Sequence, residues 1–272
     1  PILYGDETIM VGLNDKDLNT RGMIHIRDSE YWNHLMGEYV YSPAKAGCKI
    51  LVQGVDSRLG IGKTSFALSL AYEIADEVGW ELTEDDVMLS ANHFLKRYKE
   101  HPGVEQPSVM VLDEVIGAGG GDSRRSMSNR NVNMARTFEI MRKKRIILIM
   151  TAADFFSLDS RMKRLLDYVW MIQTRPRWTG LGYQVKTEFG TGAIRLKRLT
   201  DGHVYFYSMD GCPLLDHLDR QKDLLLESEA FDFDNIGGVE KKQIDFEKLG
   251  AMSHRKDPDP SKVWNYRSPK EV

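Results

Sequence analysis

The residues of this chain best suited to chemistry lie in a glycine-rich segment that ends in Gly62-Lys63-Thr64. The segment follows the apolar run 49–53 and precedes a stretch of helix-forming residues, so it predicts a turn between a strand and a helix. Backbone N–H groups in such a turn, together with the helix N-terminus, bind phosphate oxygens. The lysine can reach the outer phosphates, and the threonine hydroxyl can bind Mg²⁺. We therefore expect a nucleoside triphosphate, with Mg²⁺, to bind here.

This segment departs from the common phosphate-loop pattern G-x-x-x-x-G-K-[ST] at its first position. Ser57 stands where the first glycine would fall, and the nearest upstream glycine is Gly54, so the loop is either a relaxed or an enlarged variant. Phe66, Leu70 and Ile74 recur at helical spacing after it. A glycine-rich turn in another kind of α/β protein is the alternative. The residues expected to bind the nucleotide are Ser57, Arg58, Leu59, Gly60, Ile61, Gly62, Lys63, Thr64 and Ser65.

A second group of candidate residues follows the apolar run 108–112, where Asp113 and Glu114 are adjacent. A strand buried on both faces has no structural need for two carboxylates at its end. In phosphate-transfer proteins a strand-end aspartate helps to hold Mg²⁺, and an adjacent glutamate can polarise the attacking water. We expect Thr64 and Asp113 at the metal, Lys63 at the phosphates and Glu114 as the general base. Two solvated acids at a strand end are the alternative.

Two further residues are candidates for catalysis. Thr151 ends the apolar run 146–151 and is placed to sense the γ-phosphate or to position water. Arg161 and Arg164 lie on one side of an expected helix at a spacing of i, i+3. Either arginine could act as an arginine finger across a subunit boundary, and Arg161 is our first candidate. Ordinary surface ion pairing is the alternative for both.

The polar stretch 117–131 combines a dense glycine run with Arg124, Arg125 and Arg130. Such a run does not form a packed element. The chain as a whole has a net charge of −3, so a polyanion would have to meet a local basic region. Basic loops beside a nucleotide site suit contact with a phosphodiester backbone or with a neighbouring subunit's nucleotide. We expect these three arginines to contact nucleic acid, with a merely solvated loop as the alternative.

Apolar runs and helical patterns predict the elements that position these residues. In chain order, the first five are a strand at 49–53, a helix at 63–78, a strand at 87–90, a helix at 92–100 and a strand at 108–112. This alternation favours an α/β fold, with a mostly parallel sheet flanked by helices. Segments of period two between 184 and 209 predict a C-terminal antiparallel β extension.

The 272 residues are enough for one large α/β domain with a small appendage. We expect four parts: an N-terminal segment at 1–47 that packs on the core, a nucleotide-binding core at 48–172, a β-rich extension with a terminal helix at 173–230, and a flexible tail at 231–272.

Composition excludes several classes of protein. The two cysteines, Cys48 and Cys212, have no metal-ligand spacing and make no disulfide framework, which suits a reducing compartment. No apolar window is long enough for a membrane span, and the N-terminus lacks the pattern of a secretory signal. We expect a soluble, cytoplasmic protein with no membrane span.

Taken together, these motifs resemble those of P-loop ATPases with an additional strand and a catalytic glutamate, a group that includes RecA-like, AAA-type and FtsK/HerA-type motors. The resemblance covers about residues 48–172. The stretch 142–167 is similar to the corresponding region of HerA/FtsK-type and zonular-occludens-toxin-like ATPases of viruses, plasmids and archaea. The stretch 57–68 instead looks like the loop of DnaB-type replicative helicases. The adjacent Asp113 and Glu114 favour the first comparison, although HerA/FtsK-type proteins commonly have glutamine where Thr151 stands.

The resemblance implies an ATP-hydrolysing motor or remodelling ATPase that acts on nucleic acid, with DNA as the expected polymer, from a virus or mobile genetic element. It further implies ATP and Mg²⁺ as cofactors and a homo-oligomeric ring or filament. An ATP-dependent switch or loader, which controls a protein partner without translocation, is the alternative. A P-loop kinase fits less well, because the adjacent aspartate and glutamate indicate water as the acceptor.

Overall fold

The computed structural model describes residues 23–42, 47–55, 60–101, 107–115, 129–173, 179–188, 193–200, 203–206, 209 and 211–227. Within its helices, the side chains at 129–134, 142–143 and 225–227 lie outside this description. The strands are β1 (Met23–Ile24), β2 (Cys48–Gly54), β3 (Val87–Met88), β4 (Ser108–Leu112), β5 (Ile146–Thr151), β6 (Tyr168–Gln173), β7 (Thr179–Thr187), β8 (Ile194–Arg198) and β9 (His203–Tyr205). The helices are η1 (Ile26–Asp28), α2 (Glu30–Leu35), η2 (Met36–Val40), α3 (Lys63–Val78), η3 (Glu84–Asp86), α4 (Ala91–Glu100), α5 (Asn129–Ile140), η5 (Met141–Lys144), η6 (Phe155–Ser157), α6 (Ser160–Leu165) and α7 (Pro213–Glu227).

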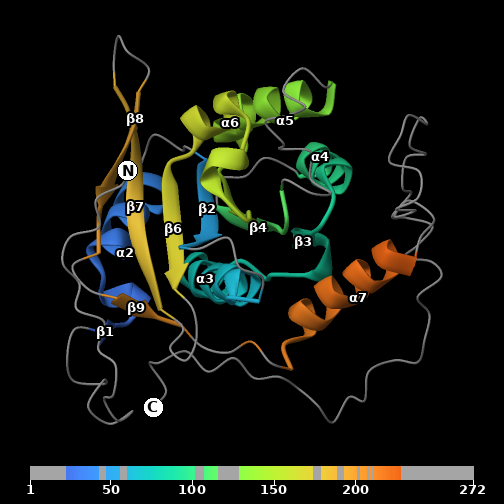
Figure 1. Ribbon diagram of the computed structural model, residues 1–272, viewed down its shortest axis with the longest axis horizontal. Coiled ribbons are helices and arrows are strands. Elements are labelled where there is room, and N and C mark those ends of the chain that lie inside the picture. The colour runs from blue at the N-terminus through green and yellow to red at the C-terminus, as the bar shows by residue number, and fades with distance from the viewer. Residues whose placement is uncertain are drawn as a thin grey trace.

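The described strands form one sheet in the order β1-β9-β7-β6-β2-β5-β4-β3, with β8 paired to β7 (Figure 1). From β6 to β3 every neighbouring pair is parallel. Strand β5 therefore lies between β2, which precedes the glycine-rich segment, and β4, which precedes Asp113. Because all these strands are parallel, the carboxyl ends of β2, β5 and β4 meet at one edge of the sheet. The predicted mostly parallel α/β sheet is confirmed.

The antiparallel strands continue the same sheet beyond β6, as β7 pairs antiparallel with β6, β8 and β9. The predicted C-terminal antiparallel extension is therefore confirmed. Its first strand depends on two glycines, because a Cβ at Gly182 would lie 3.0 Å from the ring of Trp170 and one at Gly180 would lie 2.8 Å from Ile172. Glycine allows β7 to run close to these large side chains of β6.

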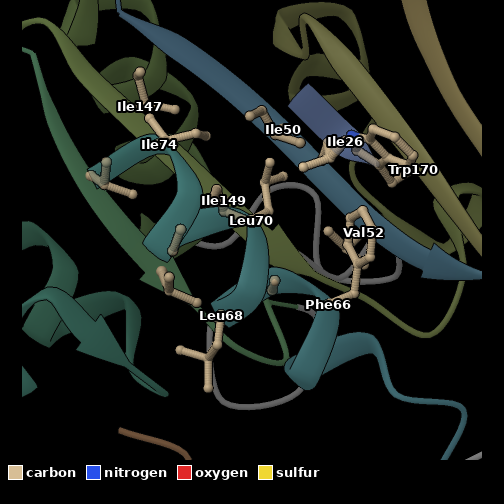
Figure 2. Close-up of a cluster of buried hydrophobic side chains, with 14 of the residues drawn as sticks. Ile26, Ile50, Val52, Phe66, Leu68, Leu70, Ile74, Ile147, Ile149 and Trp170 are labelled. Atoms are coloured by element: carbon tan, nitrogen blue, oxygen red, sulfur yellow. The ribbon is translucent and has the colours of Figure 1, made fainter. Parts of the chain in front are cut away.

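Helices cover both faces of the parallel strands, so the side chains of β2 alternate between two apolar clusters. Ile50 and Val52 face α3, whereas Leu51 belongs to the cluster on the opposite face, beside α4, α5 and α6. Figure 2 shows Phe66 and Leu70 of α3 directed toward β2. Such burial on both faces explains why the strand reads as a continuous apolar run. Packing between α3 and β2 thus sets where α3 begins relative to the end of β2.

The described part of the N-terminal segment and the last helix complete the face that carries α3. Tyr31 of α2 is fully buried and its ring contacts Trp170 edge to face, with centroids 4.6 Å apart. Leu214 and Leu218 of α7 join the same cluster, and α7 lies beside α3 and β3 (Figure 1). Among the described residues, no helix combines the length and apolar character needed to cross a membrane.

Candidate nucleotide and magnesium site

The described part of the glycine-rich segment begins at Gly60, so Ser57, Arg58 and Leu59 lie outside the described residues. Gly60 and Gly62 adopt φ angles of +72° and +84°, in the left-handed region. Side chains with a Cβ adopt this conformation rarely, so both positions favour glycine. At its described end, the expected turn therefore adopts a conformation that suits glycine, and α3 starts immediately after it.

The N-terminus of α3 has the features of an anion site. Gly62 is its N-cap residue and makes no side-chain capping hydrogen bond, and no acidic residue occupies the first turn. The first amides of a helix have no acceptor within the helix, and the helix dipole adds partial positive charge there. Lys63 and Thr64 are half-buried, whereas Ile61 and Ser65 are buried. The backbone here is suited to bind phosphate oxygens.

Thr64 and Asp113 meet although they come from distant parts of the chain. The hydroxyl of Thr64, in the first turn of α3, donates to the Asp113 carboxylate, at 3.0 Å from Oδ1 and 3.2 Å from Oδ2. Asp113 is fully buried. The contact forms because β2 and β4 are parallel and end at the same edge, the edge at which open α/β sheets bind ligands. The two groups of residues singled out in the sequence thus form one site.

Thr151 lies between these two groups, at the carboxyl end of β5. Its hydroxyl is 2.5 Å from Asp113 Oδ1, to which it donates, and it accepts the Glu114 N–H at 2.8 Å. Thr151 is almost fully buried, at 1% exposure. This side chain therefore holds both acidic residues in place. Sensing of the γ-phosphate by Thr151 stays a prediction, and positioning of Asp113 and Glu114 is the role that its contacts support.

Glu114 differs from its neighbour in environment, because its side chain is exposed whereas that of Asp113 is buried. Its backbone has φ +53°, an uncommon value for a residue with a Cβ. Neighbouring strands hold this turn: the Asp113 N–H donates to Met88 O at 2.8 Å, and the Val115 N–H donates to Thr151 O at 3.0 Å. The turn therefore buries the carboxylate of Asp113 and leaves that of Glu114 exposed to solvent.

The oxygen atoms at this edge fit Mg²⁺, which prefers hydroxyl, carboxylate and phosphate oxygens and usually takes only one or two carboxylates from the protein. Thr64 and Asp113 would hold the metal. Bound there, Mg²⁺ would supply positive charge to offset that of the phosphates. Among the described residues no group of three or more His, Cys, Asp or Glu side chains forms a separate metal site.

Lys222 of α7 completes the site, and sequence reasoning missed it. Its Nζ lies 2.8 Å from Asp113 Oδ2, and its side chain is 26% exposed. Burial alone would lower the pKa of Lys222, but attraction to Asp113 and Glu114 and a hydrogen bond to Asp113 outweigh it, so this pKa is raised and the ammonium is stabilised. Nothing in the local pattern around residue 222 indicates this contact.

The arginines proposed from the sequence are placed only in part. Arg161, in the first turn of α6, contacts the buried carboxylate of Asp159 through Nε at 3.0 Å and Nη2 at 3.1 Å. This is a local ion pair, and the arginine-finger role stays a prediction. Arg124 and Arg125 lie outside the described residues, and Arg130 lies in α5 with its side chain outside the description.

The strand order places the candidate site within the sheet. Strand β2, before the glycine-rich turn, has β5 on one side and β6 on the other, and the aspartate strand β4 follows β5. The fold is α/β, with a central sheet of mostly parallel strands flanked by helices and antiparallel strands beyond β6. No protein-family model and no curated protein matches the chain.

Solved structures with a similar fold include the N-terminal domain of zonular occludens toxin from Neisseria meningitidis, at 15% identity over 57% of this chain and 96% of that one, with a TM-score of 0.37. The genome packaging NTPase B204 from Sulfolobus turreted icosahedral virus 2, in complex with ATP-gammaS, is also similar, at 10% identity over 56% of this chain and 96% of that one, with a TM-score of 0.37. A zonular occludens toxin, the kind of protein that the motifs resemble, is thus one of the similar structures.

Proposed function

We propose that this chain is an ATPase, which binds ATP with Mg²⁺ at the carboxyl edge of its parallel strands and transfers the terminal phosphoryl group to water. The observation that carries this proposal is the contact between Thr64 and Asp113, with the exposed Glu114 directly after Asp113 in the chain. A phosphate-binding helix start, a hard oxygen pair for Mg²⁺ and an accessible carboxylate are the parts that such a reaction needs.

Each residue of the site has a distinct role in the proposal. Amides at the start of α3 and the Lys63 ammonium bind the phosphate oxygens and offset their charge. Thr64 and Asp113 hold the metal, and Thr151 keeps Asp113 in position. Glu114 accepts a proton from the attacking water, and its exposure to solvent gives water access to it.

We further propose that hydrolysis drives a motor or remodelling activity on nucleic acid, with DNA as the expected polymer, in a homo-oligomeric ring or filament of the kind carried by viruses and mobile elements. Support comes from the motif resemblance and from Arg124, Arg125 and Arg130, which follow the aspartate strand in the sequence. Clustered cations of this kind bind phosphodiester backbones without regard to sequence.

A switch or loader that acts on a protein partner is the second candidate. The contact of Lys222 in α7 with Asp113 favours it, because this contact connects the site to a peripheral helix. Steady-state ATPase rates measured with and without single- and double-stranded DNA, alongside the oligomer mass with ATP, separate the two. We expect DNA to increase turnover. Slow turnover that DNA leaves unchanged would support the switch, and absence of any hydrolysis would contradict both.

A further inference from the structure

The carboxylate of Asp113 carries more partners than its proposed metal role requires. It accepts hydrogen bonds from the hydroxyls of Thr64 and Thr151, and Lys222 Nζ lies 2.8 Å from Oδ2. A carboxylate offers about four lone-pair positions, so these three donors occupy most of them. One position at Oδ2 is occupied by the Lys222 ammonium, which brings a full positive charge from α7, a helix far along the chain from β4 and α3.

We propose that Lys222 and Mg²⁺ compete for Asp113, so that docking of the C-terminal half of α7 opposes binding of Mg²⁺–nucleotide. This inference rests on the proposed function of the same site. An ammonium and a divalent cation repel each other at such short range, most strongly where the surroundings exclude water. The ammonium also occupies Oδ2 of Asp113, the oxygen that would coordinate Mg²⁺ or accept a hydrogen bond from its bound water. Binding of the metal therefore displaces Lys222.

The contacts of α7 define which part of it would move. Its N-terminal half is anchored by the apolar cluster, because Leu214 and Leu218 are buried. In the same half, His217 Nδ1 lies 3.2 Å from the Glu84 carboxylate beside β3, and Arg220 Nη2, about one turn further along, lies 3.6 Å from that carboxylate. Arg220 and Glu84 are more than half exposed, and exposed pairs of this kind contribute little to stability.

Lys222 is therefore the strongest polar anchor of the C-terminal half of α7 among the described side chains, since its partner is fully buried. Figure 1 shows this helix running beside α3 and β3, with its C-terminal end directed away from the sheet. Loss of one charge-assisted hydrogen bond would free this half of the helix while Leu214 and Leu218 keep the first turns in place. The ATP site would thereby control how α7 is presented to a partner.

A first experiment measures the competition directly. Binding of a non-hydrolysable ATP analogue to the full chain is titrated with Mg²⁺ by calorimetry, for the wild type, Lys222→Met and Arg220→Met. We expect Lys222→Met to lower the half-saturating Mg²⁺ concentration by about tenfold, the scale of one hydrogen bond to a charged group. Arg220→Met removes a cation from the same helix without touching Asp113, and we expect a change below about twofold. Equal shifts in the two variants, or a higher half-saturating Mg²⁺ concentration in Lys222→Met than in the wild type, would overturn the inference.

A second experiment reports on the helix itself. Hydrogen–deuterium exchange is measured in peptides covering 213–227 of the wild type under two conditions. One sample contains the analogue plus a chelator, and the other contains the analogue plus Mg²⁺. We expect Mg²⁺ to speed exchange in the second half of α7, and Lys222→Met to exchange fast in both conditions. Unchanged or slower exchange on binding of Mg²⁺–analogue would overturn the inference while leaving the proposed ATPase intact. A chain that binds no analogue at all would overturn both.

Discussion

Thr151 at the end of β5 donates its hydroxyl hydrogen to Asp113 at the end of β4, over 2.5 Å, and the same oxygen accepts the N–H of Glu114. One small side chain on the intervening strand thus connects Asp113, which we propose to hold the metal, with Glu114, which we propose to polarise water. Because Thr151 is almost fully buried, water cannot replace either hydrogen bond.

Thr151→Val keeps the branched shape but removes both hydrogen bonds. The buried Asp113 carboxylate then loses a donor and the Glu114 N–H loses its acceptor, so we expect a loss of about 1–3 kcal/mol in the free energy of unfolding. Turnover should fall and the half-saturating Mg²⁺ concentration should rise. Urea unfolding and ATPase assays measure these changes, with Thr151→Ser as the control that retains the hydroxyl. A valine variant with wild-type stability and turnover would contradict the positioning role.

Lys63→Ala tests the phosphate-binding end of the site. We expect the variant to lose most of its affinity for ATP or most of its turnover, because the ammonium that offsets the phosphate charge is gone. Equilibrium binding of a fluorescent ATP analogue provides the measurement. Lys163→Ala, on α6, is the matched control, since the amine of Lys163 donates to the Phe156 carbonyl oxygen and not to a residue of the site. Full retention of binding and turnover by Lys63→Ala would remove the residue from the site.

Glu114→Gln and Asp113→Asn should have different effects on ATP binding and hydrolysis, because we propose different roles for the two acids. Glutamine cannot accept the proton, so Glu114→Gln should bind Mg²⁺–ATP nearly as well as the wild type while hydrolysis falls about 10²–10⁴-fold. Asp113→Asn should instead weaken the dependence of binding on Mg²⁺, since it removes the carboxylate charge. Single-turnover hydrolysis and metal titrations distinguish these results. Unimpaired hydrolysis in Glu114→Gln would exclude this residue as the base.

A triple alanine variant at Arg124, Arg125 and Arg130 tests the nucleic-acid contact. We expect DNA-stimulated ATPase to fall and the slope of log affinity against log salt to decrease by roughly 3 on duplex DNA, about 0.9 for each lost phosphate contact. The matched control is a triple alanine variant at Lys186, Arg195 and Lys197, exposed cations of the β7–β8 ribbon. An unaltered salt slope in the first variant would exclude those arginines, and a loss only in the control would assign the contact to the ribbon.

Arg161 should make stability depend on pH through Asp159. Burial raises the pKa of Asp159, but hydrogen bonds and charge from Arg161 outweigh it and hold this pKa below its ordinary value. A carboxyl with a lowered pKa in the folded state stabilises the fold above its unfolded pKa, and this stabilisation is lost as the pH falls through the folded pKa. We therefore expect Arg161→Ala to be less stable than the wild type at pH 7.

The stability difference between Arg161→Ala and the wild type should shrink below a pH of about 4, as Asp159 becomes protonated in both proteins. Chemical unfolding at several pH values measures it, with Arg161→Lys as the control that keeps a charge. A difference that does not vary with pH would contradict the ion-pair account. If Arg161→Ala is folded and its turnover also falls by about 10³-fold or more, this result would support Arg161 as an arginine finger.

Local patterns in the sequence determined the strand, the turn and the helix of the phosphate-binding segment. Apolar runs of strand length predicted β2, β4 and β5, and Gly60 and Gly62 predicted a turn that does require positive φ angles. The contact between Thr64 and Asp113 was also predictable, because parallel strands of an α/β sheet end at the same edge. These inferences depend on periodicity and backbone conformation, which the residues carry within short windows.

Only the tertiary structure decided which residues the side chains at the carboxyl edge of the parallel strands contact. The Thr151 hydroxyl turns to Asp113 and Glu114 because β5 lies between β2 and β4, an order that no local pattern specifies. Lys222 reaches Asp113 because Leu214 and Leu218 pack α7 beside α3 and β3. Hydrophobic packing is not directional, so the sequence of an amphipathic helix indicates that one face is buried but not against what. Packing of α7 therefore decided that Lys222, far along the chain, pairs with the carboxylate of Asp113.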